Sequence, residues 1–214
     1  MMEEGYWLFR EWSIIVKNPK YVMDVINISI RNESQYYLLL SSEENIPQHS
    51  LVGEFRHYDD SAFRFYIVLD NKQVEKAKHR EMCVSMRKDG NGQECGVAYI
   101  TNTMLIKLQR RDFNISAIWH ELGHVHNEDF DCLNILQVDE FHKLRKLCIR
   151  EGKVMGNELS ADEFACRLIG KRNMLKFLES AVQEREQFGD NNSEMAIKEL
   201  GLRIAHLKTY RVDK

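Results

Sequence analysis

The stretch His120-Glu121-Leu122-Gly123-His124 constrains this chain more than any other part of its sequence. Its two histidines lie four residues apart, and on an α-helix side chains at that spacing project from the same face. The apolar residues around them fall on the opposite side of such a helix, where they can be buried: Ile115, Ile118, Leu122 and Val125. We therefore predict an amphipathic helix over residues 114–126 whose polar edge carries two imidazoles and a carboxylate.

The polar edge of this helix has the composition of a metal site. Two imidazoles on one helix face can bind one Zn²⁺, each at about 2.0–2.1 Å. Glu121 lies about 100° further round the helix, where its carboxylate can take a proton from a water molecule on the metal. The sequence therefore favours a zinc cofactor, with His120 and His124 as ligands and Glu121 as the catalytic base. The alternative is a surface helix with an ion pair and two solvated histidines, and a third ligand would decide between the two.

Several acidic residues downstream are candidates for that third ligand. Glu128 keeps the four-residue spacing, but eight residues of helix rise about 12 Å, which is too far for one ion to bridge. Asp129 and Asp131 can return from the loop after the helix, although such residues more often form a solvated turn. Glu158 is the better candidate, because it stands at the start of a second predicted helix over residues 157–170. One turn later, Asp162 can accept a hydrogen bond from the second ring N–H of a ligating histidine.

Together the two motifs resemble those of the gluzincins, the thermolysin-like branch of the zincin metallopeptidases. Their short separation, and the form Glu-x-x-Ala-Asp-x-Phe-Ala over residues 158–165, resemble the ImmA/IrrE-type metallopeptidases and the related minigluzincins. Those families commonly carry Asn where this chain has Asp162, so this position is closer to the broader gluzincin pattern. The likeness spans roughly residues 96–170, while residues 1–90 and the last two predicted helices fall outside it.

This resemblance implies a zinc-dependent endopeptidase that cleaves a specific protein at limited sites. It also implies a zincin-like core, in which a small twisted sheet packs on the helix of the first motif and a second helix supplies the third ligand. By resemblance, His120, His124 and Glu158 are the zinc ligands and Glu121 is the base. Asp162 is then the residue that orients His120.

Residues 96–108 follow a strong turn signal and are typical of one long strand or two short ones. The resemblance implies that a sheet edge strand near residues 97–108 pairs with an extended protein or peptide substrate. The alternative is an internal strand, or a hairpin that turns at Thr101-Asn102. The chemistry also needs a group that stabilises the oxyanion or binds substrate, and His142 and Tyr99 are candidates.

Two other functions are compatible with the same motif. Peptide deformylases place a cysteine ligand upstream of a similar motif, and Cys95 occupies such a position here. The glycine-rich motifs of that family are missing, but a zinc amidase or deformylase-like hydrolase of a small substrate is the alternative enzyme. A non-catalytic module that keeps the zincin fold for binding is a further alternative, and the intact His120, Glu121 and His124 argue against it.

Composition argues against several other classes of function. The formal net charge is -3 and the pI is about 6.3, so no overall field favours nucleic acid or an anionic membrane. The five cysteines form no CxxC pair, which suits a reducing compartment. The first residues lack the pattern of a signal peptide, and no apolar run approaches the ~20 residues of a membrane span. We therefore expect a cytoplasmic protein with no nucleic-acid or membrane partner.

Hydrophobic periodicity indicates strands in the first half of the chain and helices in the second, an α+β fold. A helix is predicted over residues 5–17, either a helix or a strand over 21–30, and buried strands over 36–40 and 63–69. Further helices are predicted over residues 114–126, 138–150, 157–170, 173–188 and 193–210. We expect residues 1–90 to form an N-terminal α/β region, separate or part of the same domain. Residues 91–214 then form the zincin-like catalytic region with a C-terminal helical extension.

Overall fold

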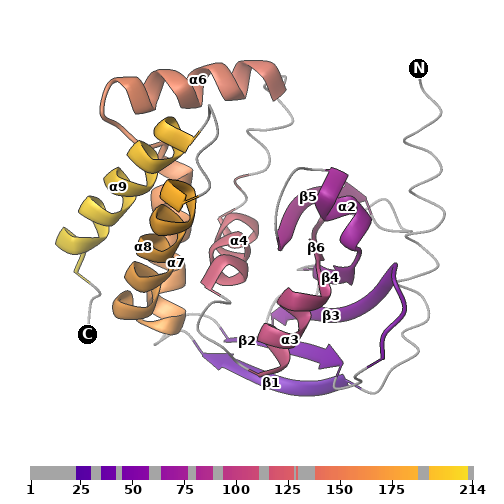
Figure 1. The fold of residues 1–214 in the computed structure, drawn as a ribbon. Coiled ribbons are helices and arrows are strands. Elements are labelled where there is room, and N and C mark those ends of the chain that lie inside the picture. Colours follow the sequence, from indigo (N-terminus) through magenta and orange to yellow (C-terminus); the bar gives the residue numbers. More distant parts are fainter. Residues whose placement is uncertain are drawn as a thin grey trace. The chain divides into compact units, whose positions relative to one another are not determined.

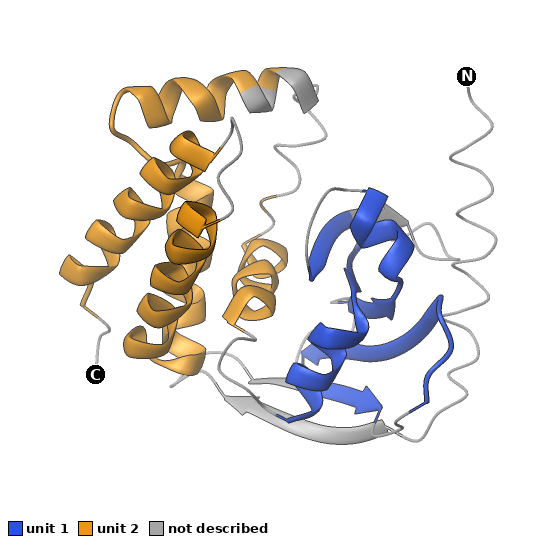
Figure 2. Cartoon of the chain, viewed as in Figure 1, with its two compact units in different colours: residues 1–115 blue, residues 116–214 orange. Residues whose placement is uncertain are grey.

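A computed structural model gives the fold of the chain (Figure 1). It describes residues 23–29, 35–41, 45–57, 64–76, 81–88, 94–110, 116–127, 129, 138–187 and 193–211. The helix predicted over residues 5–17 and the turn before residue 94 lie outside these ranges. Internal contacts divide the chain into two compact units, Met1–Ile115 and Ser116–Lys214 (Figure 2). Within the described ranges, no helix is long and apolar enough to cross a membrane.

The first unit is built on one mixed sheet, to which six strands of the described residues belong. They are β1 (Met23–Ser29), β2 (Gln35–Ser41), β3 (Ser50–His57), β4 (Phe65–Leu69), β5 (Met82–Lys88) and β6 (Glu94–Ile100). Their order across the sheet is β1-β2-β3-β4-β6-β5. Strands β4 and β6 are parallel, and the other neighbouring pairs are antiparallel. The short helix α2 (Asn71–Lys76) and β5 lie between the parallel strands in the chain.

The parallel pair forms the centre of this unit's core. All of β4 and residues 95–100 of β6 are buried, and near-continuous apolar strands are typical of parallel pairing inside a sheet. The strands predicted over residues 36–40 and 63–69 are confirmed as β2 and β4. Residues 23–29 are strand β1, as the β-branched residues in the segment favour. With the helices that follow, the chain has the predicted α+β class.

The predicted edge strand near residues 97–108 is wrong on two counts. Strand β6 ends at Ile100, and Asn102–Gln109 form helix α3 (Figure 1). Thr101 is the N-cap of this helix, because its hydroxyl oxygen accepts a hydrogen bond from the backbone N–H of Met104 at 3.3 Å. In addition, β6 lies between β4 and β5, so its neighbours already use the backbone groups of both its edges. It is an internal strand and cannot accept an added peptide strand.

All the regular elements described in the second unit are α-helices. Its helices are α4 (Ser116–His126), α6 (Val138–Arg150), α7 (Gly156–Ile169), α8 (Lys171–Gln187) and α9 (Ser193–Thr209). Each confirms a predicted helix to within a few residues at its ends. Helix α7 packs against α4, α8 and α9 (Figure 1). It ends at Gly170, whose φ of 86° favours glycine.

Helices α4 and α7 approach each other very closely at Gly123. A Cβ atom at Gly123 would lie 2.9 Å from the Cα of Ala161 and 3.0 Å from its carbonyl oxygen. Real Cβ atoms do not come this close to backbone, so only glycine fits here. The two small residues therefore let the helices meet at the point where one carries His120 and His124 and the other carries Glu158.

Candidate metal centre

Helix α4 presents its two histidines on a buried face. Ile118 and Leu122 are fully buried and hold the helix against its unit, while His120 and His124 are also buried, with 6% and 8% of their surface exposed. The two rings meet edge to face, with their centroids 4.6 Å apart. The four-residue spacing predicted this shared face. The structure adds that the face points into the protein.

Helix α7 contributes two acidic side chains to the same place. Glu158 is 8% exposed and Asp162 is fully buried, one helical turn further on. Buried carboxylates are rare unless they are paired or bind a cation. Both therefore need positively charged partners, and His120 and Arg203 lie within reach of both.

His120, His124 and Glu158 form a group that could hold a metal ion. The two histidine Nε2 atoms lie 3.1 Å apart. The Glu158 oxygens lie 3.5 Å from Nε2 of His120 and 3.9 Å from Nε2 of His124. Ligand atoms about 2.0–2.1 Å from a tetrahedral ion are about 3.3 Å from each other. The two nitrogens thus have close to tetrahedral spacing, and one ligand atom from each of the three residues lies within 4.8 Å of the others, so the carboxylate of Glu158 would move closer to both rings to complete one face of the site.

The second nitrogen of each histidine ring is held by a carboxylate. Asp162 Oδ1 lies 2.8 Å from His120 Nδ1, and Asp129 Oδ2 lies 2.9 Å from His124 Nδ1. A carboxylate accepts, so in each ring Nδ1 carries the proton that is donated. In the neutral form of each ring the lone pair is then on Nε2 and faces the other ligands, which is the orientation a metal site needs. The predicted role of Asp162 toward His120 agrees with this contact.

Arg203 of α9 is the positive group that lies among these carboxylates. Its Nε donates to Asp162 Oδ2 at 2.7 Å and its Nη2 to Asp162 Oδ1 at 2.6 Å. Its Nη1 donates to Glu158 Oε2 at 3.1 Å. Its Nη2 also lies 3.2 Å from His120 Nδ1, because both nitrogens donate to the same Asp162 oxygen. The guanidinium is itself buried, with 7% of the residue exposed.

The pKa values of this cluster show how strongly its charges are paired. Burial and the charge of Arg203 act to lower the pKa of His120, but hydrogen bonds to Asp162 and Glu158 outweigh them and raise it to about 9. Burial acts to raise the pKa values of Glu158 and Asp162, yet His120 and Arg203 lower both, and the pKa of Glu158 lies well below its ordinary range. Both carboxylates are therefore ionised at neutral pH. A cation that binds His120 would displace the proton of its Nε2.

The other residues singled out in the sequence lie at different places. Glu121 is half-buried on α4, between the two histidines in sequence. Tyr99 and Cys95 lie on β6 in the core cluster of the first unit, where they are 4% and 2% exposed. His142 belongs to α6, but its side chain lies outside the described residues, as do Glu128 and Asp131.

Sequence reasoning missed two partners of the cluster. The sequence suggests Asp129 as a ligand or as part of a solvated turn, whereas in the structure its carboxylate orients His124 from just beyond the end of α4. The sequence alone assigns no role to Arg203, because the apolar residues of its helix recur at a spacing that is typical of packing. A signal was present, because Glu199, Arg203 and Leu207 recur every four residues and form one buried stripe of α9. Two charged residues in a buried stripe point to partners on other helices.

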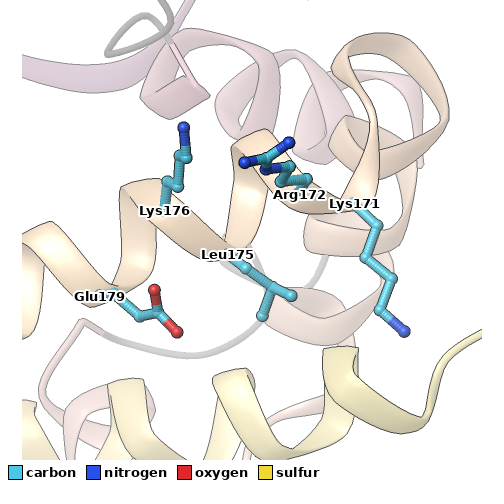
Figure 3. A pocket seen from close by; sticks show the side chains of 5 residues that line it. All are labelled: Lys171, Arg172, Leu175, Lys176 and Glu179. Atoms are coloured by element: carbon cyan, nitrogen blue, oxygen red, sulfur yellow. The ribbon is translucent and has the colours of Figure 1, made fainter.

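A separate hollow of about 540 Å³ lies on α8 and is lined by Lys171, Arg172, Leu175, Lys176 and Glu179 (Figure 3). Lys171 Nζ donates at 2.9 Å to the backbone carbonyls of Lys208 and Tyr210, at the carboxyl end of α9. A cation is favourable there, because the last carbonyls of a helix lack partners within it. The contact explains Lys171 as a cap for α9. None of the lining residues belongs to the metal-binding group.

Taken together, the fold and the site define an α+β protein with a buried group of two histidines and one glutamate that could hold a metal ion. Comparisons with protein-family models, curated proteins and solved structures give no match. A function therefore has to be inferred from the residues of the site.

Proposed function

We propose that this chain is a zinc-dependent endopeptidase with a zincin-like core. The observation that carries the proposal is the buried group of His120, His124 and Glu158, whose two histidines flank Glu121 on one helix. Two imidazoles and one carboxylate are a ligand set of catalytic zinc sites, which leave a fourth position for water or substrate. Two nitrogen donors favour zinc over calcium or magnesium, which prefer sites built from oxygen alone.

The residues around the group have distinct tasks in this proposal. Zinc, when bound, would polarise a water molecule and the carbonyl of the peptide bond. Glu121 would accept a proton from that water while the oxygen of the water attacks the carbonyl carbon. The same carboxyl would then donate the proton to the departing amine nitrogen as the C–N bond breaks, which regenerates the carboxylate. Asp162 and Asp129 would keep the two imidazoles in the tautomer that carries its proton on Nδ1 and none on Nε2.

The proposed substrate is a specific protein that is cleaved at limited sites. The internal position of β6 removes the strand that was expected to pair with it. We therefore propose no strand as the substrate-binding element, and the proposal rests on the metal group and Glu121 alone.

Replacing Glu158 by alanine is expected to weaken zinc binding by more than about 100-fold. Loss of a residue that only supports a ligand typically costs 10–100-fold, and loss of the ligand itself costs more. Isothermal titration with zinc measures the effect. Cys95→Ser is the matched control, because Cys95 is the ligand expected of a deformylase-like enzyme, and it should bind zinc as the wild type does. Strong zinc binding by Glu158→Ala, or its loss in Cys95→Ser, would contradict the proposed ligand set.

The activity itself is tested with zinc-loaded wild-type protein and a library of denatured cellular proteins. We expect new N-termini at a restricted set of sequences, detected by mass spectrometry. A chelator should abolish their formation, and added zinc should restore it. The proposal fails if zinc neither binds nor changes the thermal stability of the protein, or if loaded protein produces no new N-termini.

A further inference from the structure

Arg203 occupies an unusual position for an arginine. It is buried on α9, and all three of its guanidinium nitrogens donate to carboxylates of α7. Two of these bonds form a fork on Asp162, and the third goes to Glu158. A single side chain thus connects the candidate third ligand to the carboxylate that orients His120.

Burying a guanidinium group has a large desolvation cost, so a gain in stability does not by itself explain an arginine at this position. The partners of the guanidinium offset this free-energy cost only when the geometry is good. An apolar residue at position 203 would fill the space, but Asp162 and Glu158 would then be two buried like charges one helical turn apart. The arginine allows both carboxylates to remain ionised on the same face of α7.

The contacts also fix which way each carboxylate points. Arg203 Nη1 holds Oε2 of Glu158, and that oxygen lies 3.5 Å from His120 Nε2, while Oε1 lies 3.9 Å from His124 Nε2. With one oxygen held, the carboxylate cannot rotate freely about its terminal bond. The fork on Asp162 likewise keeps Oδ1 at 2.8 Å from His120 Nδ1. Both restraints act on the positions of atoms in the metal group.

We propose that Arg203 is a positioning residue of the metal centre, which holds Glu158 in place as a ligand and keeps Asp162 against His120. This inference rests on the proposed metal site. It assigns α9, which lies outside the motif region of the sequence, a direct part in building that site.

A second ion pair anchors the same helix from another direction. Glu199, one turn before Arg203, is buried and accepts two bonds of 2.9 Å from Nε and Nη2 of Arg145 on α6. This pair has the same forked geometry as the pair of Arg203 and Asp162, but among the hydrogen bonds described neither of its members bonds to His120, His124 or Glu158. The positive charge of Arg145 does act on Glu158, whose pKa it helps to lower, and Arg145→Lys keeps that charge. The pair therefore provides a control of matched chemistry.

The charge and the geometry of Arg203 have opposite effects on a bound cation. Its positive charge repels the ion, whereas its hydrogen bonds hold the ligands ready for it. Arg203→Lys separates the two effects, because lysine keeps the charge but lacks the planar fork. We expect this variant to bind zinc about 10–100-fold more weakly than the wild type. Arg145→Lys should bind zinc within about twofold of the wild type.

Titration with zinc and the visible spectrum of the cobalt-loaded protein test the proposal together. The cobalt spectrum reports the ligand geometry directly, so it should change in Arg203→Lys and stay unchanged in Arg145→Lys. Unaltered affinity and spectrum in Arg203→Lys would overturn the positioning role, as would equal changes in both variants. Failure of the wild type to bind either metal would instead overturn the proposed function.

A second variant keeps the test decisive if Arg203→Lys does not fold. The double variant Asp162→Asn with Arg203→Met removes both members of the fork together, while Glu158 loses its bond to Arg203 but keeps its contact of 3.5 Å with His120. We expect it to fold and to bind zinc at least about 10-fold more weakly than the wild type, because no guanidinium then fixes the orientation of Glu158 and of residue 162. Wild-type affinity in the double variant would overturn the proposal.

Discussion

Replacing Asp162 by alanine is expected to lower the free energy of unfolding by about 3–5 kcal/mol, the usual cost of removing one partner of a buried ion pair. Arg203 would keep only its bond of 3.1 Å to Glu158, and its two shorter bonds to Asp162 would be lost. The remaining buried guanidinium then has unpaired N–H donors that water reaches poorly. Urea denaturation, with a chelator present so that metal binding does not contribute, measures the change.

Glu163→Ala provides the comparison for this prediction. Glu163 is the next residue of α7 and also pairs with a residue of α9, since its Oε1 lies 2.7 Å from Nε2 of His206. Both of these side chains are about one-third exposed, at 28% and 34%, so solvent screens the pair. We expect a loss below about 1 kcal/mol. Equal losses in the two variants would show that the cluster around Arg203 is not tightly paired.

The double variant Asp162→Asn with Arg203→Met refines the interpretation. Removing both charges costs less than removing one, because no guanidinium is left buried without Asp162 and Glu158 keeps its contact with His120. We expect it to be more stable than Asp162→Ala. If it is less stable, the loss in Asp162→Ala comes from packing rather than from the unpaired charge.

The parts of the site that could be predicted from the sequence are those that depend on local periodicity. On α4, four-residue spacing places His120 and His124 on one face regardless of the rest of the fold. The same periodicity places Glu158 and Asp162 one turn apart on α7. Bringing the two pairs together required the helices to pack, and the small residues Gly123 and Ala161 at their contact made that possible.

The parts that could not be predicted depend on contacts between distant segments. Arg203 lies 41 residues from Asp162 and 83 from His120, and no local pattern links an α9 arginine to either. The strand error has a different cause. Thr101-Asn102 suits a hairpin turn and a helix N-cap equally well, and only the burial of Met104, Leu105 and Leu108 decides for the helix.

Glu121→Gln is expected to reduce the rate of peptide cleavage by about 10²–10⁴-fold, the range over which a positioned general base contributes. Glutamine has the same shape as glutamate but cannot accept the proton of the attacking water. Glu121 is not a member of the group that could hold the metal. Zinc affinity and thermal stability should therefore remain close to those of the wild type.

Cleavage rates at saturating and limiting concentrations of a peptide identified from the library test this expectation, with zinc content measured on the same samples. Glu151→Gln is the matched control, because its carboxylate is exposed and pairs only with Lys153 among the contacts described. It should cleave at the wild-type rate. A Glu121→Gln variant that retains zinc and full activity would remove Glu121 from the mechanism. If it lost zinc as well as activity, Glu121 would help to hold the metal, and it could no longer be assigned to proton transfer alone.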